Sequence, residues 1–315
     1  MSNDFTTQTA ELVFPPVTVE APTPYSSLVE VDVAALSHQG KVRTNNEDHF
    51  LVFRTGRFLE SIQTNLPDGD MPARSEEIGY GMVVADGMGG TKGGEVASRL
   101  AIKTLINLAL QLPDWIMRVD DKMAREAMKR ATHRYKQVDA AIGRQAAEDP
   151  ELSGMGTTMT AAYSIGADLF IIHVGDSRAY LLRDGRLHQL TRDQTLVQTL
   201  VDLGELTPEG ASSHPLRHVL THALGLHQGR VSVEAQRCKL RDGDYLLVCT
   251  DGLTEMVRNE QISQLLLRGL PAKDDCQSLV DLALQNGGKD NVTVALARYS
   301  LPAKPARVEP SGALG

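Results

Sequence analysis

Four aspartates stand next to short apolar runs, in positions where carboxylates could hold metal ions. Asp86 follows Val83–Ala85, Asp176 follows Phe170–Gly175, Asp251 follows Leu246–Thr250, and Asp290 precedes Val292–Leu296. If the four runs are buried strands that end at one edge, the carboxylates repel one another unless divalent cations neutralise them. An all-oxygen set of ligands suits Mg²⁺ or Mn²⁺ rather than zinc. The alternative is that each aspartate caps a turn independently, as Asp-Gly pairs often do.

The sequence around Asp86 excludes two common phosphate-binding loops. Glycines follow Asp86 closely and bring bare backbone near whatever binds there. A nucleotide-binding P-loop requires a lysine followed by a hydroxyl residue, but Lys92 is followed by Gly93. A dinucleotide fingerprint counted from Gly87 and Gly89 would end on Lys92 instead of glycine. The junction between this strand and the next helix is therefore a candidate cation site.

A short polar segment offers a phosphate-binding group. Arg43 precedes Asn46, Glu47 and Asp48. A guanidinium beside an acidic metal centre can bind a phosphoryl group through two parallel hydrogen bonds. A surface ion pair between Arg43 and Asp48 explains the same pattern equally well.

Strands come in runs here instead of alternating singly with helices. Apolar runs predict strands at 31–36, 49–54, 82–85, 158–165, 169–174, 179–182, 245–250 and 292–297, and helical periodicity predicts helices at 95–111, 121–148, 262–267 and 276–285. Residues 55–78 look like a polar surface insertion, and 193–225 like a weakly helical flap. This order favours an α+β fold in which helices cover antiparallel sheets.

Composition limits the partners. The 315 residues carry a net charge of −8, which argues against nucleic acid or an anionic membrane as the main partner. The first residues lack the basic start and apolar core of a signal peptide, and the three cysteines form no C-x-x-C pair, so a cytoplasmic location is expected. Residues 1–30 and 300–315 are rich in proline and polar residues and are predicted to be disordered tails around one domain, 31–299.

Six motifs occur in an order that resembles one enzyme family. They are Arg43–Asp48 (RTNNED), Val84–Gly90 (VADGMGG), Gly154–Thr158 (GMGTT), His173–Arg178 (HVGDSR), Cys249–Leu253 (CTDGL) and Gly288–Thr293 (GKDNVT). Together they resemble the metal-dependent protein phosphatases of the protein phosphatase 2C type, in the compact bacterial branch. The resemblance implies two stacked antiparallel β-sheets flanked by helices, an α-β-β-α sandwich.

The resemblance also implies a role for each motif. Asp86 would bridge two Mn²⁺ or Mg²⁺ ions, the Gly87 carbonyl would bind one of them, and Asp251 and Asp290 would complete the other. Asp176 and Asp251 would hold a third, weaker ion. Arg43 would bind the substrate phosphate, Glu47 and Asp48 would support the metal-bound waters, and His218 would match a flap histidine that influences substrate handling.

The implied reaction is hydrolysis of phosphoserine and phosphothreonine on proteins by a metal-activated water. Such an enzyme would act as a monomer on phosphoproteins and would reverse a eukaryotic-like serine/threonine kinase. Met88 stands where many eukaryotic relatives carry a histidine, so the leaving group would take its proton from a metal-bound water, or from His214 or His218. A silent phosphoprotein-binding module and a phosphatase for small metabolites are the rival hypotheses.

Overall fold

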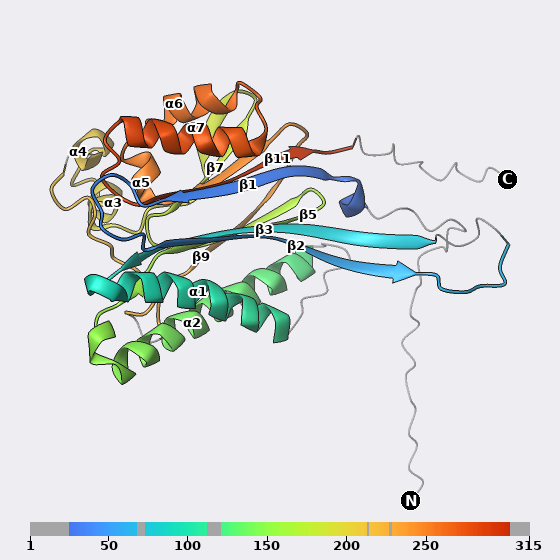
Figure 1. The fold of residues 1–315 in the computed structure, drawn as a ribbon, viewed down its shortest axis with the longest axis horizontal. Coiled ribbons are helices and arrows are strands. Elements are labelled where there is room, and N and C mark those ends of the chain that lie inside the picture. Colours follow the sequence, from blue (N-terminus) through green and yellow to red (C-terminus); the bar gives the residue numbers. More distant parts are fainter. Residues whose placement is uncertain (1–24, 68–72, 112–120, 213, 227–228, 303–315) are drawn as a thin grey trace, which may run out of the picture.

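Two antiparallel sheets lie face to face, and helices cover both outer surfaces (Figure 1). This is a computed structural model, which describes residues 25–67, 73–111, 121–212, 214–226 and 229–302. The architecture confirms the predicted α-β-β-α sandwich. The predicted tails lie mostly outside the described residues, so their disorder stays a prediction.

The first sheet has five strands in the order β1-β11-β10-β7-β8. Their bounds are β1 Glu30–His38, β11 Val292–Ser300, β10 Tyr245–Cys249, β7 Arg178–Arg183 and β8 Arg186–Gln189. The helices α6 (Asn259–Leu266) and α7 (Ala272–Gln285) cover its outer face (Figure 1). The turn at Asp184 and Gly185 joins β7 to β8 in a hairpin, and both residues have positive φ, as a two-residue hairpin turn of this type requires.

The second sheet has the order β2-β3-β5-β6-β9, with β4 paired to β3. Its strands are β2 Asp48–Glu60, β3 Arg74–Met88, β4 Gly156–Thr157, β5 Met159–Ile165, β6 Asp168–Val174 and β9 Glu234–Lys239. The sequence analysis missed β9, whose charged residues hide the apolar alternation that marks a strand. The helices α1 (Gly90–Gln111) and α2 (Asp121–Glu148) cover the outer face of this sheet (Figure 1).

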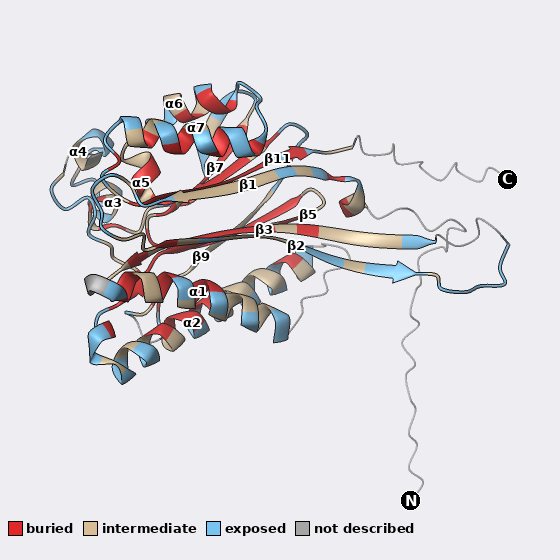
Figure 2. Ribbon diagram, in the orientation of Figure 1, coloured by how far each residue is buried: buried red, intermediate tan, exposed pale blue. Residues whose placement is uncertain are grey.

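Buried apolar residues form one cluster between the sheets and one beneath each pair of helices. Figure 2 colours the buried residues red along the ribbon. Between the sheets, Val84 and Ile171 of the second sheet belong to the same cluster as Leu246 and Ala295 of the first. Every residue of β6 is buried, which is why its sequence reads as an unbroken apolar run. Strands that are apolar on both faces therefore lie at the centre of the sandwich. Their burial fixes the positions of the residues at the ends of these strands.

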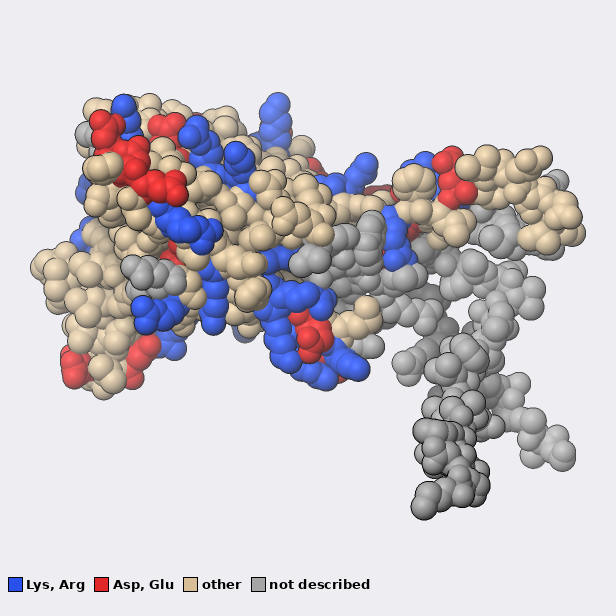
Figure 3. All heavy atoms as spheres, turned by 90° about the horizontal axis from the view of Figure 1, so that it is seen from below, with Lys and Arg blue, Asp and Glu red and all other residues tan. Residues whose placement is uncertain are grey.

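The long helix α2 is amphipathic, as its sequence predicts. Tyr135, Val138 and Ile142 are fully buried against the sheet. The opposite face is charged, and its first three turns expose Lys122, Arg125, Lys129 and Arg130. Figure 3 shows basic side chains gathered on this helix-covered face of the molecule. The spacing of about 3.6 residues per turn thus assigns one face to the core and the other to water.

The predicted surface insertion at 55–78 is wrong for its two flanks, which are strands. Residues 61–67 and 73 lie outside any strand, whereas 55–60 and 74–78 form a two-stranded extension of the sheet, because β2 and β3 stay paired from Asp48↔Asp86 as far as Glu60↔Arg74 (Figure 1). Phe58 and Leu59 are exposed on this extension, and Ile62 is exposed just beyond it. The sequence gives no clear alternation here because the extension is exposed on both faces and polar residues are tolerated.

Three short helices lie at one end of the sandwich. They are α3 (Leu196–Asp202), α4 (Pro208–Ser212) and α5 (Asp251–Thr254). Two 3-10 turns complete the structure, η1 (Tyr25–Leu28) and η2 (Pro150–Leu152). Among the described residues, no helix is both long and apolar enough to span a bilayer.

Asp275 on α7 is a buried carboxylate that should destabilise the fold. Within the described part of the chain, neither of its side-chain oxygens has a hydrogen-bond partner. Burial raises the pKa of Asp275 to about 6, although Arg268 opposes the shift. A raised folded-state pKa means that the stability present below about pH 4 is lost as pH rises through 6.

Asp275→Asn is therefore expected to increase the free energy of unfolding at pH 8 by on the order of 1 kcal/mol. The gain should vanish near pH 4, where Asp275 itself is protonated. Urea denaturation at both pH values measures it, and Asp274→Asn, at the exposed neighbouring position, is the matched control. A variant less stable than the parent at pH 8 would show that the carboxylate is stabilising.

Candidate functional site

The predicted metal-binding aspartates come from both sheets and meet at one end of the sandwich. Asp86 lies on β3, directly opposite Asp48 on β2. Asp251 begins α5 after β10, Asp290 precedes β11, and Asp176 follows β6. Asp251 lies close enough to Asp86 to raise its pKa, although 165 positions separate the two residues in the sequence. The structure thus brings together residues that independent turn caps would leave apart.

Asp86 does not end its strand, contrary to the sequence-based prediction. Strand β3 continues through Gly87 to Met88, and these two residues pair with Thr157 and Gly156 of β4. The backbone of Asp86 is held by both neighbouring threonines: its N–H donates to Thr158 Oγ1 at 3.1 Å, and its carbonyl accepts from Thr157 Oγ1 at 2.7 Å. These bonds fix the direction of the Asp86 side chain.

Glycines let helix α1 approach Asp86 closely. A Cβ on Gly87 would overlap the carbonyl of Gly94, and a Cβ on Gly94 would overlap Gly87 and the Glu47 carboxyl group. The first turns of α1 therefore rest directly on the strand that carries Asp86. Ser98, one turn further along α1, donates to the Glu47 carbonyl at 2.6 Å and holds the Arg43–Asp48 segment in place.

Burial and mutual repulsion raise the pKa values of these carboxyl groups. The pKa of Asp86 is well above its ordinary value because of burial, with Asp48, Asp251, Asp176 and Asp290 adding to the rise. Burial, Glu255 and Asp290 raise the pKa of Asp251 to about 6. Burial and Asp251 likewise raise that of Asp176. Without cations, these groups cannot all be ionised at neutral pH.

Asp48 supplies a direct test of whether divalent cations fit. It is buried, and its Oδ2 accepts hydrogen bonds from Thr293 Oγ1 at 2.7 Å and Thr250 Oγ1 at 2.9 Å. Its Oδ1 is buried without a partner among the described residues. An unpartnered buried carboxylate oxygen is costly unless a cation or a metal-bound water meets it. The oxygen-rich cluster therefore fits Mn²⁺ or Mg²⁺, which Asp86, the Gly87 carbonyl, Asp251 and Asp290 would hold, with Asp176 nearby.

Arg43 pairs with Asp290 and not with Asp48, which excludes the alternative that Arg43 and Asp48 form a surface ion pair. Its guanidinium nitrogen lies 2.5 Å from Asp290 Oδ2. The side chain of Arg43 is still 53% exposed, so the guanidinium can reach a ligand from solvent. Asp290 and its hydrogen bond raise the pKa of Arg43 further, and the group stays charged. A permanent positive charge thus lies at the open edge of the carboxylate cluster.

Asn291 organises the segment that carries Arg43, and the sequence analysis missed it. Its Oδ1 accepts from the N–H of Glu47, and its Nδ2 donates to the carbonyls of Gln39 and Asn45, each at 2.8 Å. One side chain at the start of β11 therefore ties down a loop some 245 residues earlier in the chain. In the sequence, Asn291 is marked only by its place next to Asp290 in the motif Gly288–Thr293.

His218 lies beside the cluster, in the segment predicted as a flap. Its Nδ1 is 2.7 Å from Glu255 Oε1, one turn of α5 beyond Asp251. The C-terminal end of the flap segment is hydrogen-bonded to β4 beside the site, because Leu224 and Thr157 exchange two backbone hydrogen bonds. The segment contains α3 and α4, in line with the predicted weak helicity. A role for His218 in substrate handling stays a prediction.

Arg178 completes the surroundings of Asp176. It forms a bidentate ion pair with Asp193, with nitrogen–oxygen distances of 2.6 and 2.9 Å. The positive charge of Arg178 opposes the rise in the pKa of Asp176. Asp193 begins the flap segment, so this pair also fixes where that segment leaves the sheet.

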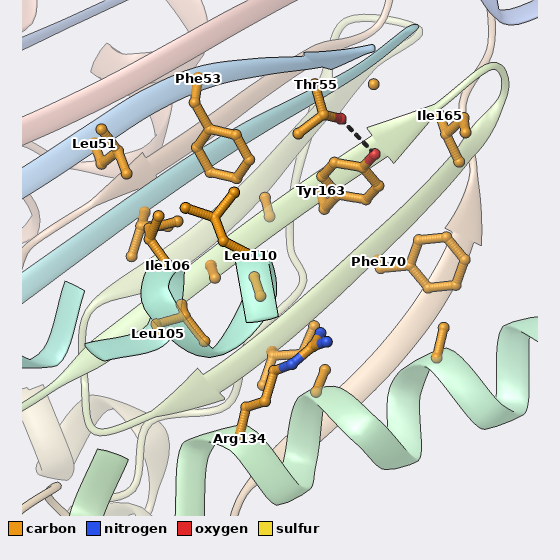
Figure 4. Close-up of a pocket in the computed structure, with 18 of the residues that line it drawn as sticks. Leu51, Phe53, Thr55, Leu105, Ile106, Leu110, Arg134, Tyr163, Ile165 and Phe170 are labelled. Carbon is orange, nitrogen blue, oxygen red and sulfur yellow. Dashed lines mark hydrogen bonds between the residues drawn. The ribbon is translucent and has the colours of Figure 1, made fainter. Parts of the chain in front are cut away.

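A separate cavity of about 810 Å³ lies between the second sheet and the helices α1 and α2 (Figure 4). Its walls are mostly apolar and include Phe53, Leu105, Ile106, Tyr163 and Phe170. None of the clustered aspartates lines it. The cavity is therefore not where the predicted chemistry would take place.

Comparison with known proteins agrees with the geometry. A family model described as protein phosphatase 2C matches residues 60–296. The chain is 39% identical over 265 residues to the serine/threonine protein phosphatase PstP of Mycobacterium tuberculosis, covering 84% of this chain and 44% of that protein. It is 32% identical to the protein phosphatase PhpP of Streptococcus pneumoniae, covering 84% and 96%. The chain thus spans less than half the length of the first relative.

Solved structures of similar proteins share the fold of this chain. The crystal structure of the M. tuberculosis phosphatase PstP/Ppp has a TM-score of 0.68 at 38% identity, covering 86% of this chain and 99% of that one. A structure of the PstP catalytic domain in complex with two manganese ions has a TM-score of 0.66 at 36% identity, with the same coverage. Motifs, fold and similarity agree: this chain belongs to the protein phosphatase 2C family, among its bacterial members.

Proposed function

We propose that this protein is a metal-dependent protein-serine/threonine phosphatase, which hydrolyses phosphate monoesters on phosphoproteins. The observation that carries the proposal is the convergence of Asp86, Asp251 and Asp290 beside Arg43, with the Asp48 oxygen left unpartnered. The related PstP catalytic domain binds two manganese ions, which supports Mn²⁺ or Mg²⁺ as the cofactor here. The proposed catalytic domain is 31–299, between tails at 1–30 and 300–315.

Each residue near the centre has a part in this proposal. A pair of divalent ions, when bound, supplies Lewis acidity and an activated water. Asp86, Asp251, Asp290 and the Gly87 carbonyl hold them, and Asp176 adds a ligand for a weaker third ion. Arg43 binds the equatorial oxygens of the phosphoryl group, where charge develops during transfer. Glu47 and Asp48 would accept hydrogen bonds from the waters bound to these ions.

The test is hydrolysis of a phosphothreonine peptide with Mn²⁺, with and without a chelator. We expect turnover that the chelator abolishes and that excess Mn²⁺ restores. A panel of phosphorylated metabolites run in parallel separates a protein phosphatase from a metabolite phosphatase. Metal binding without turnover on any phosphorylated substrate would favour the silent binding module instead.

Arg43→Ala is expected to lower kcat/KM for the phosphopeptide by about 10²-fold, the size of effect seen when one charge-stabilising group is removed. Arg43→Lys should recover part of this loss, because lysine keeps the charge but not the paired hydrogen bonds. Steady-state kinetics measures both. Stability should change by less than about 1 kcal/mol, because the Arg43–Asp290 pair is largely exposed. Equal rates in the three proteins would remove Arg43 from the mechanism.

The physiological partners are proposed only by class. Phosphoproteins modified by a serine/threonine kinase, in the cytoplasm, fit the activity named for the bacterial relatives. Opposition to a particular kinase, action as a monomer and the cytoplasmic location stay predictions. Phosphoproteomics of a strain that lacks the gene would identify the substrates.

A further inference from the structure

One imidazole and two carboxylates meet at the edge of the aspartate cluster. They are His218 from the flap segment, and Asp251 and Glu255 from the turn that contains α5. One ligand atom from each lies within 4.8 Å of the other two. Glu255 belongs to none of the roles assigned above, and His218 is the residue that brings a nitrogen atom to an otherwise oxygen-only centre.

The two carboxylates are held on one face by the helical turn. The N–H of Glu255 donates to the carbonyl of Asp251 at 2.9 Å. Residues four apart in a helical turn have neighbouring side chains, so the two carboxylates point the same way. Two like charges in this arrangement repel each other, and the imidazole of His218 is the third group beside them.

The backbone that directly follows His218 is anchored. The carbonyl of the next residue, Val219, accepts from the N–H of Leu196 at 2.8 Å, and Leu220 forms a β-bridge with Thr195. The side chain of His218 is partly exposed, so a cation can reach it from solvent. His218 is therefore positioned by its backbone and does not depend on the contact with Glu255 alone.

The spacing suits a single cation. Ligands about 2.1 Å from a metal lie roughly 3 Å apart when adjacent and about 4.2 Å apart when opposite. The 2.7 Å between His218 Nδ1 and Glu255 Oε1 needs to widen by only a few tenths of an ångström. Imidazole together with carboxylates favours Mn²⁺, Fe²⁺, Co²⁺ or Zn²⁺ over Mg²⁺, which prefers oxygen.

We propose that His218, Asp251 and Glu255 form a mixed nitrogen–oxygen site for a transition-metal cation, in which the flap segment supplies the nitrogen ligand. The site rests on the proposed metal centre through Asp251, which the two would share. A cation bound there links the flap segment to α5, and Mn²⁺ and Mg²⁺ should therefore hold this segment to different degrees.

Pulsed electron paramagnetic resonance of the full chain with excess Mn²⁺ tests the ligand directly. We expect ¹⁴N modulation typical of a directly bound imidazole, which changes to the ¹⁵N pattern when only histidine is labelled with ¹⁵N. This measurement uses the unaltered protein, so it does not depend on whether a variant folds. Absence of nitrogen modulation at saturating Mn²⁺ would overturn the proposal and leave only a His218–Glu255 ion pair.

Substitutions identify which histidine is responsible. His218→Asn should abolish the modulation and weaken the most loosely held Mn²⁺ by at least about tenfold in calorimetric titration, while Mg²⁺ affinity stays within about twofold. His214→Asn is the matched control on the same segment, because His214 Nδ1 accepts from the N–H of Leu216. Modulation that survives His218→Asn, or disappears in His214→Asn, would refute the assignment.

Glu255→Gln separates ligation from a structural contact. Glutamine can still hydrogen-bond His218, but it lacks the negative charge, so Mn²⁺ affinity at this site should fall while the apo protein keeps its stability. Unchanged Mn²⁺ affinity would count against the site. The two proposals fail in different ways. If the proposed phosphatase activity is wrong, phosphopeptide turnover is absent. If the mixed nitrogen–oxygen site is wrong, Mn²⁺-dependent turnover remains but the nitrogen signal is absent.

Discussion

Asp86→Asn is expected to lower kcat/KM for a phosphothreonine peptide in Mn²⁺ by at least about 10³-fold. The residue lies at the centre of the carboxylate cluster, and its pKa is raised by the largest set of acidic neighbours. Asparagine keeps the shape but offers one neutral oxygen, so it cannot bridge two cations. Loss of metal-ion stabilisation is worth several kcal/mol, which corresponds to three or more orders of magnitude in rate.

The matched control is Asp184→Asn, because Asp184 is also followed by a glycine. Asp184 occupies an exposed hairpin turn with a φ of 51°, a conformation that asparagine accepts readily. It should keep full activity, which would show that the loss is specific to the clustered aspartate. Activity of Asp86→Asn within tenfold of the parent would mean that Asp86 does not hold the catalytic ions.

The apo protein is expected to lose on the order of 3 kcal/mol of stability between pH 5 and pH 8 because of Asp48. Burial raises the pKa of Asp48 to about 7, although hydrogen bonds from Thr293 and Thr250 oppose this. A raised folded-state pKa favours folding while the group is protonated in the native state. Stability is therefore present at low pH and is lost as pH rises through 7. Asp86 and Asp251, with raised pKa values, add to the same trend.

Chemical denaturation in a chelator across this pH range measures the loss. Saturating Mn²⁺ should reverse it, because a ligand at 100 times its Kd stabilises the folded state by about 2.7 kcal/mol per site. Asp48→Asn should remove the share of this loss that comes from Asp48, whereas Asp275→Asn should leave that share in place. An apo protein equally stable at pH 5 and pH 8, with no effect of Mn²⁺, would show that these carboxylates are not crowded.

Local patterns determined the elements that position the site. Helix α2 begins at Asp121 and ends at Glu148, as its apolar spacing predicts, because a helical face is defined by residues three and four apart. The runs before Asp176 and Asp251 are strands β6 and β10, since short continuous apolar segments are those that a two-layer core buries. The six motifs were sufficient to predict the family and the fold.

Strand lengths and pairing were less predictable. The sequence placed Asp86 at the end of a strand, whereas β3 continues to Met88 because β4 pairs with it there. The two flanks of the predicted insertion at 55–78 are strand, because β2 and β3 satisfy each other's backbone groups beyond the core. Hydrogen bonds to a partner strand extend a strand past its own apolar residues, and the identity of that partner is not a local property.

The sequence alone predicted which carboxylates and which arginine to expect at the site, because their residue types and motifs are visible in one dimension. Only the tertiary structure showed that Arg43 pairs with Asp290, 247 positions away, and that Asp48 lies beneath Thr250 and Thr293. It alone placed Asn291 under the Arg43 segment and His218 against Glu255. Such contacts depend on how two sheets stack and where their connections cross, and the packing of the whole chain sets this rather than the preferences of neighbouring residues.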